Sequence, residues 1–341
     1  MKRGRGQGGK LRTAVIGVGH LGKFHARIYK ENPRSELACV VDTSPARAQE
    51  LARELGCAAL ESPEQLPADI DAVSIAVPTV HHARVAIPLL ERSIPCLVEK
   101  PLAANMGEAR AILDAARRGA AQLAVGHVER FQPGLRKVRE MKLAPRFIEC
   151  HRLAPFSFRS MDVGVVHDLM IHDLDLVLDL VDDEVESCDA AGGAILTEHE
   201  DVASVRLVFK NGARANVTAS RASMSPMRRF RMFSRENYVS LDLVKNYGLV
   251  IQKGPEWESG REALRSTDPA LLAARKDWLQ EKVLRIQELE LGQMDRPLQA
   301  ELDSFLVCVA EGRAPEVSGE DGARALELAD RIAAAIRSQQ W

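Results

Sequence analysis

Short apolar runs alternate with amphipathic segments along residues 11–125. LRTAVIG, LACVV, DAVSIAV and IPCLVE are short, strongly apolar runs typical of buried strands, and each is followed by a loop and a segment with helical apolar spacing. Strand and helix in regular alternation predict a parallel, doubly wound sheet. The loops at the strand carboxyl ends, including VPTVHH and VEKPL, should converge on one crevice.

The pattern changes after residue 126 to a helix followed by mainly antiparallel strands. VASVRLVFKNGARANVTASRA predicts a hairpin with a type I′ turn at Asn211-Gly212. We expect an open sheet with one face on helices and the other available to a second subunit. Residues 255–296 should be a loop and an exposed helix, before two closing amphipathic helices. The predicted parts are a disordered tail (1–10), a cofactor domain (11–125), an α+β substrate and oligomerisation domain (126–315), and a helix packing back on the cofactor domain (316–341).

Composition narrows the class of protein. With 341 residues, 46% of them hydrophobic, the chain can form two cored globular domains. Its net charge of -2 provides no basic field for nucleic acid or an anionic membrane. The six scattered cysteines and the lack of a signal-peptide apolar core predict reduced thiols in a cytoplasmic protein without membrane spans.

A glycine motif follows the first predicted strand. Gly17, Gly19 and Gly22 fill GxGxxG between a strand and a helix, the context that makes this weak pattern informative. They would permit the tight turn, pyrophosphate approach and helix packing. The second strand ends at Asp42, which can accept the ribose hydroxyls and repel a 2′-phosphate, so NAD is expected over NADP.

Four motifs together resemble the Gfo/Idh/MocA family of NAD(P)-dependent oxidoreductases. GVGHLGKFH, AVPTVHH, VEKPLA and DLMIHD stand in the family's order and spacing, over nearly the whole chain. The resemblance implies that Lys100 lies beside the nicotinamide and the reacting hydroxyl, where a cation could also stabilise alkoxide character. The predicted cofactor residues are Gly17, Gly19, His20, Leu21, Gly22, Asp42, Thr79, His82, Glu99 and Lys100.

The segment DLMIHDLDLVLDLVDD, residues 168–183, combines a histidine with six aspartates. Projected as an α-helix, most of its acids form one stripe, which predicts a solvated face for Asp179, Asp182 and Asp183, whereas Asp173 falls in the apolar arc without explanation. Asp168 and His172 are four residues apart, so the carboxylate can orient the imidazole as a general base.

The family resemblance implies the same catalytic set: His172, Asp168 and Lys100. A metal site formed by Asp168, His172 and Asp175 is a rival, although a nicotinamide cofactor makes a metal unnecessary. His167 could line the substrate pocket or be a core histidine.

GHVERFQP, HRLAPFSFRSMDVGVVHDLMIHDLDL, VTASRAS and VSGEDGARALELA resemble a subgroup acting on UDP-N-acetylglucosamine. This implies oxidation of the sugar 3-hydroxyl for lipid A biosynthesis, with an aminotransferase as functional partner. Arginines could hold the diphosphate. The predicted substrate residues are Lys100, His127, Arg130, Arg159, His167 and Arg221, with Arg152, Arg228 and Arg229 as further candidates.

Two alternatives remain open. One is a dehydrogenase of a free polyol or sugar of the inositol type. The other is a catalytically silent NAD-binding regulator. In each case we expect a small-molecule ligand, a homo-oligomer (dimer or tetramer) formed through the C-terminal sheet, and no nucleic acid partner.

Overall fold

The computed structural model describes residues 9–157, 163–266, 268, 270, 274–289, 291 and 296–339. The described chain divides into two compact units. The first unit combines residues 1–131 with 295–330, and the second combines residues 132–294 with 331–341. Most of the predicted tail, residues 1–8, and the candidate Arg159 lie outside the described residues.

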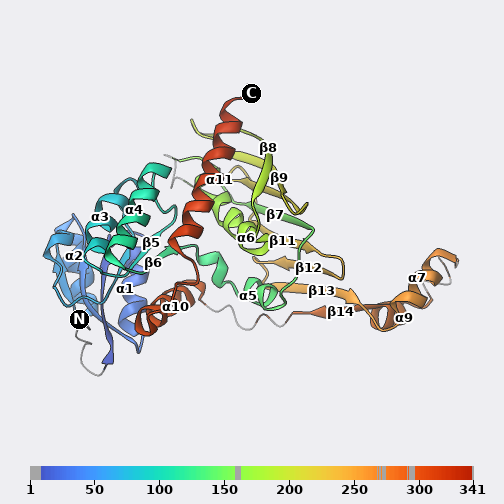
Figure 1. The fold of residues 1–341 in the computed structure, drawn as a ribbon, viewed down its shortest axis with the longest axis horizontal. Coiled ribbons are helices and arrows are strands. Elements are labelled where there is room, and N and C mark those ends of the chain that lie inside the picture. Colours follow the sequence, from blue (N-terminus) through green and yellow to red (C-terminus); the bar gives the residue numbers. More distant parts are fainter. Residues whose placement is uncertain are drawn as a thin grey trace. The chain divides into compact units, whose positions relative to one another are not determined.

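A parallel sheet of six strands forms the centre of the first unit (Figure 1). Its order, β3-β2-β1-β4-β5-β6, reverses direction between β1 and β4, and such a reversal opens a crevice at the strand carboxyl ends. The strands are β1 (Leu11–Ile16), β2 (Ser35–Val41), β3 (Ala58–Leu60), β4 (Ala72–Ile75), β5 (Cys96–Glu99) and β6 (Leu123–Gly126).

Helices cover both faces of this sheet, as a doubly wound fold requires. Apolar side chains of α3, α4 and the first part of α11 pack into one core, and those of α1, α2 and α10 pack into another. The helices of the unit are α1 (Gly22–Glu31), α2 (Pro45–Leu55), η2 (Pro63–Gln65), η3 (Thr79–His81), α3 (His82–Glu91), α4 (Met106–Gly119), η4 (Val128–Phe131), α10 (Pro297–Glu311) and α11 (Gly319–Arg337), which continues into the second unit.

The second unit contains an eight-stranded sheet in the order β14-β13-β12-β11-β7-β10-β9-β8. Every neighbouring pair is antiparallel except β7 and β10. The strands are β7 (Phe147–Leu153), β8 (Val185–Gly193), β9 (Val202–Phe209), β10 (Arg214–Ser220), β11 (Met227–Phe233), β12 (Asn237–Asp242), β13 (Tyr247–Lys253) and β14 (Leu284–Glu288). The two sheets confirm the predicted fold class.

Apolar and polar side chains alternate along the strands of this second sheet, so the apolar ones share one face, and that face is buried. Cys150, Val205 and Val217 share that face through the register of β7, β9 and β10. The helices of the unit are α5 (Pro133–Glu140), a π-helical turn η5 (Val166–Met170), α6 (Ile171–Val181), α7 (Trp257–Ser266), α9 (Lys276–Trp278) and a π-helical turn η6 (Leu279–Val283).

Two local predictions differ from the structure. The 255–296 region contains β14 as well as helices, and β14 extends the sheet by pairing with β13. The β9–β10 hairpin is present, but Gly212 has φ 80° while Asn211 is not among the residues with positive φ, so the turn is not type I′. Gly212 N–H donates to Phe209 O at 2.9 Å, as in a type I turn followed by a left-handed glycine.

The compact units also differ from the predicted domain boundaries. Helix α10 contributes Leu302, Phe305 and Leu306 to a core of the first unit, although the sequence placed it in the second domain. Helix α11 packs in the first unit as far as residue 330 and in the second from Arg331 onward. All six cysteines are free.

Candidate cofactor and catalytic residues

The glycine loop between β1 and α1 has the geometry expected of a pyrophosphate-binding turn. Gly17 has φ 83°, and a Cβ there would lie 2.7 Å from Ala76 O. A Cβ on Gly22 would lie 1.7 Å from Gly17 O, so only glycine lets α1 start this close to the turn. Gly19 has no atom within 4 Å of its would-be Cβ. The empty side of Gly19 is where a phosphate group can approach the backbone.

Asp42 follows β2 and lies in the same crevice. Its Oδ2 accepts the N–H of Val18 at 2.9 Å, and its Oδ1 accepts the N–H of Ser44 at 2.9 Å. These bonds fix the carboxylate next to the glycine loop. Arg47 lies 3.4 Å from Oδ2, a cation that the sequence analysis did not identify.

A cavity of about 490 Å³ lies at this edge of the sheet, within the usual size range of small-molecule sites. Its walls contain five of the predicted cofactor residues, namely Gly17, Gly19, His20, Leu21 and Asp42. The walls also contain Arg47, His81 and Arg84, which the sequence analysis did not identify. The full lining is Ile16, Gly17, Gly19, His20, Leu21, Val41, Asp42, Thr43, Arg47, Glu61, Pro63, Ala76, Val77, Pro78, His81, Arg84 and Val85.

His82 is buried beneath the loop that follows β4, whereas its neighbour His81 lines the cavity. The His82 Nδ1 atom lies 3.0 Å from Pro101 O, and Nε2 lies 3.0 Å from Val77 O. Burial lowers the pKa of His82, although the surrounding carbonyls oppose that shift. The ring therefore joins the loops after β4 and β5. Thr79, also predicted to contact the cofactor, begins the short helix η3, which directly precedes α3.

Glu99 is the last residue of β5, and its carboxylate contacts helix α1. His25 Nε2 lies 3.0 Å from Glu99 Oε1, with His25 completely buried. The backbone N–H of Lys100 donates to Glu99 Oε2 at 3.3 Å. Burial would raise the pKa of Glu99, but His25 and Lys100 outweigh it and lower that pKa. Glu99 thus fixes the backbone of Lys100, whose side chain is partly buried.

His127 and Arg130 follow β6 in the first unit, and both are buried. Arg130 Nη2 lies 3.6 Å from Asp321 Oδ1 on α11. Burial would raise the pKa of Asp321, but Arg130 and Ser318 lower it. This ion pair, in which the arginine is buried and the aspartate half-buried, joins α11 to the loop after β6, and it argues against Arg130 as a ligand of a substrate diphosphate.

Asp168 and His172 lie at the start of the acidic helix in the second unit, and both are partly exposed. Asp168 belongs to the π-helical turn η5, and His172 is the second residue of α6. π-Helical turns inside α-helices are frequent at functional sites. His167, also partly exposed, lies in the same turn. The catalytic roles of these residues remain predictions.

The solvated face predicted for this helix is confirmed only in part. Asp182 is exposed, and Asp179 and Asp183 are half-buried. Asp175 is buried, and so is Asp173, which the projection placed in the apolar arc without explanation. Arg152 on β7 binds Asp173 through two bonds, Nε to Oδ2 at 2.7 Å and Nη2 to Oδ1 at 2.8 Å. Asp179 lies 2.8 Å from Arg139 Nε. The π-helical turn shifts the phase of the projection, and most residues of α6 are buried, so Asp173 and Asp179 pair with arginines.

Arg221, another predicted substrate arginine, is buried beside Asp201 in the second unit, with Nε 2.7 Å from Oδ1. Of the further candidates, Arg152 is bound to Asp173, and the exposed Arg229 lies 3.7 Å from Asp242. Among the described residues, no group of three or more His, Cys, Asp or Glu side chains could hold a metal ion. No helix in the described ranges is long and apolar enough to cross a membrane.

Two family models match the chain. Residues 11–127 match the oxidoreductase family with NAD-binding Rossmann fold, and residues 108–237 match the GFO/IDH/MocA C-terminal domain. The chain is 37% identical over 329 residues to a UDP-N-acetylglucosamine 3-dehydrogenase of Acidithiobacillus ferrooxidans, covering 96% of this chain and 98% of that one. The solved structure of that enzyme, GnnA, has a TM-score of 0.85 with the same coverage.

A more distant relative is the myo-inositol 2-dehydrogenase of Thermotoga maritima, at 26% identity over 93% of this chain and 94% of that protein. Together the two matched domains span residues 11–237. The chain therefore belongs to the Gfo/Idh/MocA family of NAD-dependent oxidoreductases acting on CH–OH groups.

Proposed function

We propose that this protein oxidises the 3-hydroxyl of UDP-N-acetylglucosamine to the 3-keto nucleotide sugar. The observation that carries the proposal is the 37% identity, over nearly the full length of both chains, to an enzyme named for that reaction. Inositol dehydrogenases are related at lower identity or over less of the chain, so a free polyol is the second candidate.

The cofactor would supply the hydride acceptor, and the crevice around Gly19 and Asp42 would hold its pyrophosphate and adenosine ribose. His172 would take the hydroxyl proton, with Asp168 orienting its ring. Lys100 would stabilise negative charge on the substrate oxygen as the C3–H bond breaks. The products are the ketone, reduced cofactor and one proton, which balances the reaction.

The Glu99 contacts support the role given to Lys100. A cation contributes to catalysis only when it is held near its working position. The bond from Lys100 N–H to Glu99, and the contact of Glu99 with buried His25, fix the backbone from which this side chain extends.

The direct test supplies the purified enzyme with UDP-N-acetylglucosamine and NAD, with a 2-ketoacid to recycle NADH if needed. Mass spectrometry should find a nucleotide sugar two hydrogens lighter, and absorbance at the NADH band should rise. Oxidation of an inositol with no turnover of the nucleotide sugar would favour the second candidate. NAD binding without oxidation of either would favour an NAD-binding regulator.

Variants test the residue roles. Lys100→Ala should lose hydride transfer while NAD binding measured by calorimetry stays within about threefold of wild type. His172→Asn should reduce turnover similarly, with partial recovery at high pH, because hydroxide replaces the missing base. Near-normal turnover in either variant would remove that residue from its role.

We further propose a cytoplasmic homo-oligomer acting in lipid A biosynthesis, before an aminotransferase that consumes the 3-ketone. The chemistry supports this order, because a ketone on the sugar ring is the substrate that transamination requires. The second sheet offers one less-buried face for subunit contact. Light scattering of the purified protein tests the oligomeric state, and coupling to an aminotransferase tests the product's fate.

A further inference from the structure

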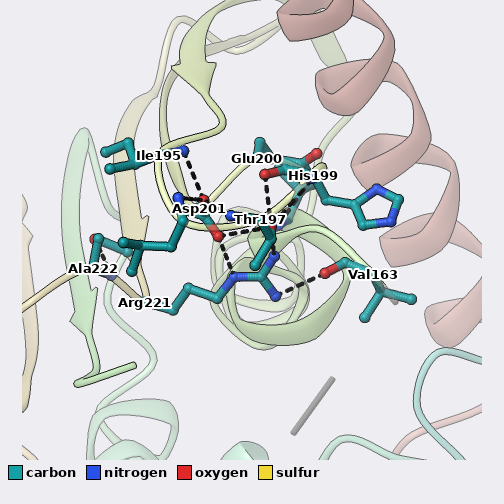
Figure 2. Close-up of polar contacts among 11 residues, drawn as sticks. Val163, Ile195, Thr197, His199, Glu200, Asp201, Arg221 and Ala222 are labelled. Atoms are coloured by element: carbon teal, nitrogen blue, oxygen red, sulfur yellow. Dashed lines mark hydrogen bonds and ion pairs between the residues drawn. The ribbon is translucent and has the colours of Figure 1, made fainter. Parts of the chain in front are cut away.

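A buried ion pair lies where the β9–β10 ladder ends in the second unit. Arg221 directly follows β10 and Asp201 directly precedes β9, so the two residues continue the strand register. The Arg221 N–H donates to Asp201 O at 2.9 Å, and the guanidinium Nε lies 2.7 Å from Asp201 Oδ1 (Figure 2). Both side chains are buried, so water screens the pair very little.

The guanidinium of Arg221 donates hydrogen bonds to three different acceptors. Besides Asp201, its Nη1 donates to Val163 O at 2.8 Å and its Nη2 donates to Thr197 Oγ1 at 2.8 Å (Figure 2). A planar guanidinium can serve three acceptors in fixed directions, whereas a lysine ammonium on a flexible stem cannot reproduce that geometry. The side chain therefore connects one loop, 194–201, to the segment that leads into η5.

Asp201 organises that loop. Its Oδ2 accepts the backbone N–H groups of Ile195 at 2.7 Å and Thr197 at 2.9 Å, and also that of Leu196. Burial would raise the pKa of Asp201, but these N–H groups and Arg221 outweigh burial and hold that pKa well below its ordinary range. The carboxylate stays ionised across the pH range in which the enzyme would work.

Glu200 extends the contact to the first turn of the helix. Val165 N–H donates to Glu200 O at 2.8 Å, and Val166 N–H donates to Glu200 Oε1 at 3.4 Å. A Cβ on Gly164 would lie 1.9 Å from Glu200 Oε1, so the carboxylate packs directly on that glycine. A carboxylate at a helix N-terminus satisfies unpaired N–H groups and is favoured by the helix dipole.

We propose that Thr197, Glu200, Asp201 and Arg221 form a latch that positions the start of the catalytic helix. They hold residues 163–166 at three points, namely Val163 O, Val165 N and Val166 N. Asp168 and His172 extend from the turns that follow. Arg221 is then a positioning residue, because its N–H groups serve the protein's own acceptors instead of a diphosphate. The catalytic consequence rests on the proposed role of His172.

The test compares Arg221→Lys and Thr197→Val with Arg139→Lys. Arg139 pairs with Asp179 in α6, well after the first turn, and supplies a matched loss of an arginine–aspartate contact on the same helix. A misplacement of about 1 Å can cost roughly 100-fold in rate. The latch predicts that kcat falls by about 10–100-fold in Arg221→Lys and less in Thr197→Val, with KM for UDP-N-acetylglucosamine within about threefold. Arg139→Lys should keep its kcat.

Two further measurements separate the explanations. UDP affinity, measured by calorimetry, should be unchanged in Arg221→Lys; a large loss of UDP affinity with kcat intact would instead make Arg221 a diphosphate ligand and overturn the latch. Amide hydrogen exchange at Val165 and Val166 should accelerate in both latch variants and stay normal in Arg139→Lys. Unchanged exchange would refute the latch even if the enzyme acts on another substrate, so this arm is independent of the proposed function.

Discussion

Removing the imidazole of His25 would leave the Glu99 carboxylate buried without its nearest partner. His25 is completely buried, Glu99 is 7% exposed, and Nε2 and Oε1 are 3.0 Å apart. Breaking a buried pair from one side typically costs about 3–5 kcal/mol.

We expect His25→Ala to lower the free energy of unfolding by about 3 kcal/mol, the lower end of that range, because Glu99 keeps the N–H of Lys100. His25→Gln should lose about half as much, since an amide N–H can still donate to the carboxylate. Urea denaturation followed by far-ultraviolet circular dichroism gives both values. Arg27→Gln on the same helix is the matched control, because the exposed Arg27–Glu54 pair is screened by water and should contribute little to stability.

The stability difference should depend on pH in a defined direction. The folded pKa of Glu99 is depressed in the wild type, so its contribution is present above the ordinary glutamate pKa of about 4.3 and is lost as the pH falls through the folded pKa. The deficit of His25→Ala should therefore be largest at neutral pH and shrink below about pH 4. An equally stable His25→Ala variant, or no coupling in a cycle with Glu99→Gln, would refute the reasoning.

Two predictions concern the cofactor crevice. Gly19→Ala should fold with wild-type stability but bind NAD more than about tenfold more weakly, because the added methyl enters space that the pyrophosphate needs. Gly22→Ala should instead lose stability, because its methyl would overlap Gly17 O. Thermal melts and NAD calorimetry distinguish the two variants, and unchanged NAD affinity in Gly19→Ala would contradict the phosphate position. Asp42→Ala should raise the ratio of kcat/KM for NADP to kcat/KM for NAD by about tenfold or more. The substitution removes the carboxylate that repels a 2′-phosphate and leaves Arg47 free to contact that phosphate. An unchanged ratio would show that Asp42 does not select the cofactor.

The cofactor crevice was the most predictable part of the molecule, because its signals are local. Gly17, Gly22 and Asp42 stand at fixed offsets from two apolar strands, and a chain with that order has few ways to fold. His25 follows Gly22 by three residues, on the face of α1 that meets β5, yet nothing in the sequence names Glu99 as its partner. That contact joins segments whose positions depend on the completed sheet.

The acidic helix shows where sequence reasoning ends. The projection assumed one α-helix with a solvent-facing side, but η5 changes the number of residues per turn and most residues of α6 are buried. Asp173 is explained by Arg152 on β7, and the helix start is capped by Glu200 from a loop 34 residues further along. Partners this distant in sequence leave no spacing pattern to read.

The assignment of α10 to the first unit affects how the protein is made. Leu302, Phe305 and Leu306 cover one face of a sheet whose strands all lie before residue 127. At a translation rate of about 5–20 residues per second, that face stays uncovered for roughly ten to thirty seconds before α10 is synthesised. Nascent chains should therefore be chaperone clients during that interval, and a gene truncated before α10 should yield an aggregation-prone fragment instead of a free-standing NAD-binding module.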